Sequence, residues 1–167
     1  MALPSATSGY TQSIPLPIDS GPTTLETTHD CVVGVGMPTV DFLYLVKDSF
    51  LTEHKIEKES VQCVDREDFE RFLKLFQTTP KLATGGCCSN TIKALCRLKM
   101  KTSISGRLGS DSHAQFYKAA MEALGATVRS VKTVGDTQQI AVMVTPDHKR
   151  SCVAHLGVGA SFCRADI

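Results

Sequence analysis

The sequence has no tryptophan, no long apolar run and no clear excess of charge of either sign. Lys and Arg total 18 and Asp and Glu total 17, so the chain has neither a basic surface for nucleic acid nor an acidic tail. No stretch approaches the roughly 18 apolar residues that a membrane-spanning helix needs. The first residues also lack the basic and apolar regions of a secretory signal. We therefore expect a soluble, cytoplasmic protein that binds neither nucleic acid nor a membrane.

The cysteines lack the spacing of a disulfide framework or a zinc site. Seven are present, an odd number, and no C-x-x-C pair occurs. His29, Asp30 and Cys31 come nearest to a metal-ligand cluster, but three adjacent residues rarely all point at one ion. We expect no metal site and mostly buried, reduced thiols. The G-x-x-x-x-G-K-[ST] phosphate loop is also absent.

Composition divides the chain into a tail and one folded unit. Residues 1–28 are rich in Ser, Thr, Pro and Gly without apolar periodicity, so we expect them to be disordered. Residues 29–167 alternate β-branched runs with amphipathic segments, which predicts an α/β fold with a mainly parallel sheet flanked by helices and a late antiparallel flap. The expected strands lie near 31–36 (a buried strand), 40–46, 58–63, 102–105, 128–131, 139–145 and 150–156, and the expected helices lie at 66–77, around 92–96 and at 112–124.

A glycine pair precedes one of these helices. In the expected loop 84–90, Gly85 and Gly86 let the backbone approach a ligand without an intervening Cβ, and the N–H groups of the next helical turn are unpaired. Asn90 adds an amide that both donates and accepts hydrogen bonds. Together these groups suit a ligand rich in hydroxyls, although a purely structural glycine turn would leave the same pattern.

Asp41 is a carboxylate within a mainly apolar run. Its two oxygens can accept hydrogen bonds from two neighbouring hydroxyls of a ligand. The alternatives are that it caps a turn or lies on the exposed side of an edge strand. The preceding Gly34-x-Gly36 resembles the start of the dinucleotide-binding motif. Pro38 and an extended run replace the helix of that motif, so we reject dinucleotide binding at this position.

Several segments together resemble the PfkB, or ribokinase, family of sugar and nucleoside kinases. GGCCSN at 85–90 and SISGRLGSD at 103–111 resemble the first signature of the family, with matching spacing. GVGMPTVD at 34–41 is similar to its first strand, and DHKRSCVAHLGVGA at 147–160 is similar to a strand pair before its mid-chain helix. The resemblance covers about residues 30–163 and is closest in look to adenosine kinases.

The resemblance implies a ribokinase-like fold and roles for four residues. Asp41 would bind ribose or sugar hydroxyls, Gly85 and Gly86 would offer backbone groups to the same hydroxyls, and Asn90 would complete the site. The implied activity is ATP-dependent phosphorylation of a hydroxyl on a nucleoside or sugar, with an adenosine-like or ribose-like substrate. ATP and Mg²⁺ are the implied cofactors.

The resemblance also implies a lid. Segments at about 45–63 and 137–156 would supply strands that cover the substrate and exclude water. The same lid offers a surface for a homodimer.

A second signature of the family, a Gly-Ala-Gly-Asp-like motif, does not occur in the sequence. Gly157–Ala160 is superficially similar but lacks the Asp that would take the proton of the attacking hydroxyl. We therefore expect no catalytic residue in this chain, which would be the N-terminal part of a kinase domain truncated at its C-terminal side, with the ATP and Mg²⁺ sites outside it. The alternative is a catalytically inactive, truncated isoform that acts as a binding or dimerisation module.

Overall fold

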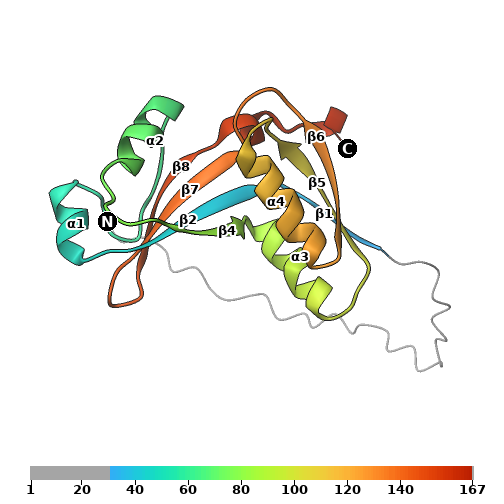
Figure 1. The fold of residues 1–167 in the computed structure, drawn as a ribbon, viewed down its shortest axis with the longest axis horizontal. Coiled ribbons are helices and arrows are strands. Elements are labelled where there is room, and N and C mark those ends of the chain that lie inside the picture. Colours follow the sequence, from blue (N-terminus) through green and yellow to red (C-terminus); the bar gives the residue numbers. More distant parts are fainter. Residues whose placement is uncertain (1–30, 167) are drawn as a thin grey trace, which may run out of the picture.

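The computed structural model describes residues 31–166 and contains two sheets with helices on them (Figure 1). The tail expected over 1–28, together with His29 and Asp30, lies outside the described residues. The α/β fold with a parallel sheet and covering helices, predicted from the sequence, is confirmed. Across 31–166, none of the helices is both long and apolar enough to cross a membrane.

The first sheet, called the parallel sheet below, has three strands in the order β1-β5-β6. Both pairings are parallel. Two neighbouring helices, α3 and α4, pack on it (Figure 1). The strands are β1 (Val32–Val35), β5 (Thr102–Leu108) and β6 (Ala126–Lys132), and the helices are α3 (Cys87–Arg97) and α4 (Ser112–Ala123).

The second sheet, called the mixed sheet, has five strands in the order β3-β8-β7-β2-β4. Its β7–β8 hairpin and its β2–β4 pair are antiparallel, whereas β2–β7 and β3–β8 are parallel. Helices α1 and α2 lie at one end of this sheet, and α3 and α4 lie at the other (Figure 1). The elements are β2 (Thr39–Leu45), α1 (Asp48–Glu53), β3 (Val61–Cys63), α2 (Arg66–Leu73), β4 (Lys81–Gly85), β7 (Gln138–Val144) and β8 (Arg150–His155), followed by the short 3-10 helices η1 (Gly157–Ser161) and η2 (Arg164–Asp166).

Alternation along β2 gives the mixed sheet two different faces. Phe42 and Tyr44 are buried, and they pack against aromatic side chains from α2 and the turn after it. Phe42 meets Phe69 edge-on at 6.2 Å between ring centroids, and Tyr44 stacks on Phe76. Because side chains alternate along a strand, Asp41 and its i+2 neighbour lie on the opposite face.

Small residues let α3 approach the parallel sheet closely. A Cβ on Gly34 would lie 2.6 Å from Sγ of Cys88 and 2.8 Å from Ile92, so glycine is needed for this packing. The helices are also joined to each other, because the buried hydroxyls of Ser89 and Tyr117 lie 2.7 Å apart in a hydrogen bond. The positions around the candidate site are therefore fixed by tight helix–sheet contacts.

Three local expectations were wrong. The first strand is not buried, since Val32, Val33 and Val35 are 36%, 52% and 44% exposed; β1 pairs with β5 alone among the described strands. The loop expected at 84–90 reduces to one residue, because β4 pairs with β2 as far as Gly85 and α3 starts at Cys87.

The third difference concerns the end of a helix. The helix expected over 66–77 ends at Leu73, and the turn that follows places Phe76 on the ring of Tyr44. Tertiary packing therefore decided where α2 ends. The strand expected near 58–63 is present as Val61–Cys63, and helix α1, Asp48–Glu53, lies between it and the end of β2.

Candidate functional site

Sheet register brings Asp41 against the glycine pair. In the antiparallel pairing of β2 with β4, Thr39 lies opposite Gly85, and Asp41 lies opposite Ala83. The Asp41 side chain leans along the strand toward Gly85, so a Cβ on Gly85 would overlap the carboxylate. Glycine at this position is therefore required for the carboxylate to lie where it does.

Gly86 joins the end of β4 to the start of α3. Its φ of +93° lies in the left-handed region that favours glycine, and a Cβ there would lie 2.8 Å from the carbonyl oxygen of Met37. Gly86 is the N-cap residue of α3, and no side chain within the described residues caps this helix end. The N–H groups of the first turn are therefore available to a ligand next to the Asp41 carboxylate.

Asn90 lies one helical turn into α3. Its backbone N–H donates to the carbonyl of Gly86 at 3.0 Å, and its side chain is exposed. The structure thus brings the Asp41 carboxylate against Gly85, and it places Gly86 and Asn90 directly after Gly85 at the start of α3. Their role in substrate binding stays a prediction.

The carboxylate of Asp41 is poorly solvated. Its Oδ1 atom is buried and has no hydrogen-bond partner within residues 31–166. Burial raises the pKa of Asp41, and the positive charges of Lys93 and Arg150 oppose that rise. An unpaired acceptor with two nearby cations is suited to receive hydroxyl donors from a ligand.

The face of the mixed sheet that carries Asp41 is largely apolar next to the carboxylate. The strand register places Leu43, Ile140 and Cys152 on this face. Burial raises the pKa of the Cys152 thiol; the charge of Arg150 opposes this rise, and the charge of Asp41 adds to it. A ligand at Asp41 would therefore meet an apolar surface next to a group of polar sites. Asp41, Gly85, Gly86 and Asn90 make up this group, which is called the corner below.

Sequence reasoning missed Lys93, Arg150 and Cys152. Lys93 could have been found, because it follows Asn90 by three residues and so lies on the same face of α3. Arg150 and Cys152 could not, since their position beside Asp41 depends on the parallel pairing of β2 with β7, which no local pattern encodes.

Asp111 has a structural role at the junction of the two sheets. It is the N-cap of α4 and accepts from the N–H of Ala114 at 2.9 Å. It also accepts from the N–H and the hydroxyl of Thr137, at 2.9 and 2.7 Å, just before β7. One carboxylate thus fixes the start of α4 to the start of a strand in the mixed sheet.

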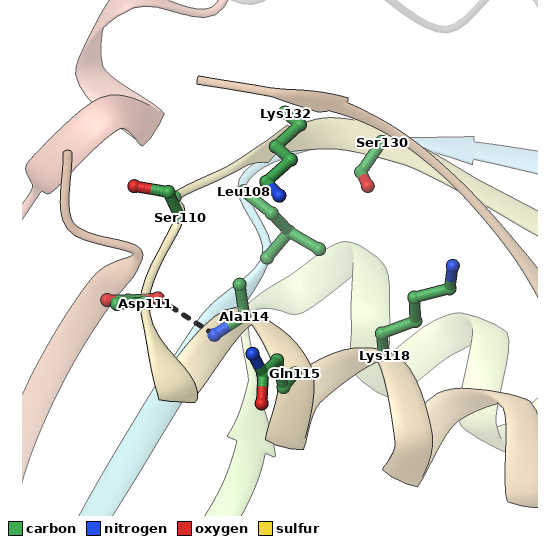
Figure 2. A pocket seen from close by; sticks show the side chains of 9 residues that line it. Leu108, Ser110, Asp111, Ala114, Gln115, Lys118, Ser130 and Lys132 are labelled. Carbon is green, nitrogen blue, oxygen red and sulfur yellow. Dashed lines mark hydrogen bonds between the residues drawn. The ribbon is translucent and has the colours of Figure 1, made fainter. Parts of the chain in front are cut away.

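A cavity of about 300 Å³ lies beside the first turns of α4, away from Asp41. Figure 2 shows Lys132 and Ser130 of β6 and Lys118 of α4 around it, together with the hydrogen bond from Ala114 to Asp111. None of the four predicted substrate residues lines this cavity.

Neither a metal-ligand group nor a glycine-rich phosphate loop occurs in the described part of the chain. Among residues 31–166, no group of three or more His, Cys, Asp or Glu side chains is arranged to hold a metal ion. The sequence also has no glycine-rich phosphate loop. We therefore derive no step through ATP or Mg²⁺ from these residues.

Comparison with solved structures shows the fold. Adenosine kinase from Sinorhizobium meliloti matches with a TM-score of 0.75 and 22% identity over 83% of this chain and 43% of its own. A probable sugar kinase from Rhizobium etli CFN 42 matches with a TM-score of 0.77 and 23% identity, over 83% of this chain and 42% of its own. Adenosine kinase from Schistosoma mansoni in complex with adenosine matches with a TM-score of 0.69 and 20% identity, over 81% and 40%. These matches show a ribokinase-like fold, and the chain spans about two fifths of the length of each of these proteins.

Comparison with protein families identifies the chain more closely. The model of the pfkB family carbohydrate kinases matches residues 60–165, more than half of the sequence. The matched range includes the glycine pair, Asn90 and Asp111, which carried the resemblance in the sequence. The chain belongs to the pfkB family of carbohydrate kinases.

Proposed function

We propose that this chain supplies the substrate-binding half of an ATP-dependent kinase that phosphorylates a hydroxyl of a nucleoside or sugar. The observation that carries the proposal is the contact between the Asp41 carboxylate and Gly85 at the uncapped start of α3. Acceptors on Asp41 and donors on the first turn of α3 converge there, and vicinal hydroxyls can satisfy both. Asn90 provides a further donor and acceptor at the rim.

A nucleoside is the substrate class that the corner supports best. The hydroxyl-binding groups lie at one end of an apolar face that includes Leu43 and Ile140. With a ribose bound at Asp41, the attached base of a nucleoside could lie on that apolar face. A free sugar would leave the same face exposed to water. The adenosine complex of the Schistosoma mansoni kinase is consistent with this choice.

The division of labour in this proposal follows from the residues present. The chain binds and orients the hydroxyl substrate, and phosphoryl transfer depends on groups outside it. A catalytic base, a nucleotide site and a magnesium site are therefore assigned to no residue here. The lid expected at about 45–63 and 137–156, the homodimer through it and the cytoplasmic location stay predictions.

Substitution of Asp41 tests the proposal. In the full chain, Asp41→Asn replaces an ionised acceptor by a neutral amide of the same size, so affinity for adenosine should fall by about 10- to 100-fold, the weight of a charge-assisted hydrogen bond. Isothermal titration calorimetry with adenosine and with ribose measures the effect and ranks the two substrate classes. Asp68→Asn, on the exposed surface of α2, is the matched control and should change nothing. Equal affinities for wild type and Asp41→Asn would refute the assignment.

A further inference from the structure

Helix α3 carries a single lysine, and it points toward the candidate site rather than into solvent. Lys93 is half-buried, and its Nζ donates a hydrogen bond to the carbonyl oxygen of Thr84 at 2.5 Å. Thr84 directly precedes Gly85, the residue that the Asp41 carboxylate touches. The ammonium is therefore held at a defined place beside the corner by a backbone acceptor on β4.

The charge of Lys93 acts on Asp41. Burial raises the pKa of Asp41, and Lys93 is the stronger of the two cations that oppose this. Burial in turn lowers the pKa of Lys93, and Asp41 opposes that. The other ionisable groups on this face are Arg150 and Cys152 of β8 and Lys81 of β4, which lies opposite Leu43. The direct partners of Asp41 on β4 and β7, Ala83 and Ile140, are uncharged.

Lys93 and Arg150 differ in how firmly they are held. Arg150 is exposed on β8, so water and salt screen its attraction for Asp41. Lys93 is partly desolvated and fixed to Thr84, so its field at the carboxylate is screened less and varies less. A fixed, partly buried cation is the better counter-charge for an acceptor that has no hydrogen-bond partner of its own.

We infer that Lys93 is a positioning residue that keeps the Asp41 carboxylate ionised and ready to accept substrate hydroxyls, and that it also fixes the end of β4 beneath the glycine pair. In this role Lys93 acts through Asp41 and Thr84 and needs no contact with the substrate. The inference rests on the proposed substrate role of Asp41. It adds a fourth kind of group to the corner: a dedicated counter-charge on α3.

Titration of the Asp41 carboxyl in the ligand-free full chain tests the effect of the Lys93 charge directly. Lys93→Gln keeps an N–H donor for the Thr84 carbonyl but removes the charge, so the Asp41 carboxyl should titrate at higher pH than in the wild type, as followed by ¹³C NMR. Lys93→Arg keeps the charge and should titrate close to the wild type. Arg97→Met removes a cation from the same helix one turn further on. Arg97 acts on Lys93 but is not among the charges that act on Asp41, so it is the matched control.

The pH dependence of binding is the second measurement. Only the ionised carboxylate accepts hydrogen bonds with both oxygens, so a raised pKa means that binding is lost at a higher pH as the solution is acidified. Between the two pKa values, the ratio of wild-type to Lys93→Gln affinity for adenosine should grow by up to about tenfold per pH unit as pH falls. Well above both values the ratio should level off near one.

The outcomes separate this inference from the proposed function. If the wild-type chain binds neither adenosine nor ribose, the proposed function fails, and the titration of Asp41 still decides the role of Lys93. If Asp41 titrates identically in the wild type and in a folded Lys93→Gln chain, the inference on Lys93 is overturned. Should Lys93→Gln not fold, Lys93→Met, which fills the same space without charge, provides the same comparison.

Discussion

The two sheets of this protein are stabilised in different ways. The parallel sheet uses small residues: Gly34 admits Cys88 and Ile92 of α3, and a hydroxyl pair joins α3 to α4. The mixed sheet uses large ones, since rings from β2, α1 and α2 stack and cross to form an aromatic core. One region gains stability from close backbone approach and the other from buried area.

The candidate site lies where these two regions meet. Asp41 belongs to the mixed sheet, Gly86 is the joint, and Asn90 and Lys93 belong to a helix of the parallel sheet. Polar contacts join the two regions, as at Asp111 with Thr137 and, beside the site, at Lys93 with Thr84. Because the two regions are stabilised differently, each can hold its own residues of the site rigidly, and the polar groups lie at the junction between the regions.

The largest expected effect comes from breaking the aromatic core. Phe69 is 2% exposed and packs on Phe42, so Phe69→Ala should destabilise the protein by about 3–5 kcal/mol. Hydrogen exchange should show lost protection in β7 and β8, with less change in β5 and α4. Uniform loss throughout the chain would show that the two regions unfold as one unit and would break the comparison.

The junction itself gives the next effect. Asp111 caps α4 and also accepts two hydrogen bonds from Thr137, so Asp111→Ala should cost about 2–3 kcal/mol in urea unfolding. Asp65→Ala is the matched control, because Asp65 caps α2 with one bond to the N–H of Asp68, and it should cost about 1 kcal/mol. Equal costs would mean that the bonds to Thr137 add nothing.

The acid behaviour of Asp111 sharpens the same test. Burial alone would raise its pKa, but the hydrogen bonds from Thr137 and Ala114 outweigh burial and lower it. A lowered pKa contributes stability that is present above the ordinary pKa and is lost as pH falls through the lowered value. Asp111→Ala should therefore lose less of its remaining stability on acidification than the wild type does.

The smallest effect is expected within the parallel sheet's helices. Tyr117→Phe removes the bond to Ser89 and should cost about 1–2 kcal/mol near neutral pH. Burial raises the pKa of Tyr117 to about 12, so this side chain favours the folded state below its ordinary pKa, and that contribution is lost as pH rises from about 10 to about 12. Tyr117→Phe should thus show a shallower alkaline loss of stability, measured by denaturant titration, and a curve parallel to that of the wild type would contradict this.

Sequence patterns predicted the order of most elements and failed where contacts far along the chain decide. The cap at Asp65 and the positive φ of Gly125 after α4 follow local rules that residue type alone indicates. The early end of α2 was not anticipated, because Phe76 leaves the helical path to stack on Tyr44. The exposure of β1 was not anticipated either, since three valines within four residues favour burial in any local scheme.

The candidate site divides in the same way. The glycine pair, Asn90 and Asp41 carry chemistry that residue type and spacing can suggest. Their contact, and the presence of Lys93 and Arg150 beside the carboxylate, depend on strand pairing between residues more than forty positions apart. The geometry of this corner follows from the register of the paired strands, which a single sequence does not reveal.

The alternation along β2 has an evolutionary consequence. Asp41 and Phe42 are adjacent in the chain, yet one faces the polar corner and the other the aromatic core. Insertion or deletion of one residue upstream in this strand would exchange their faces, burying a carboxylate among rings and presenting a ring to the glycine pair. Descendants of this gene can therefore vary β2 by replacement far more readily than by change of length.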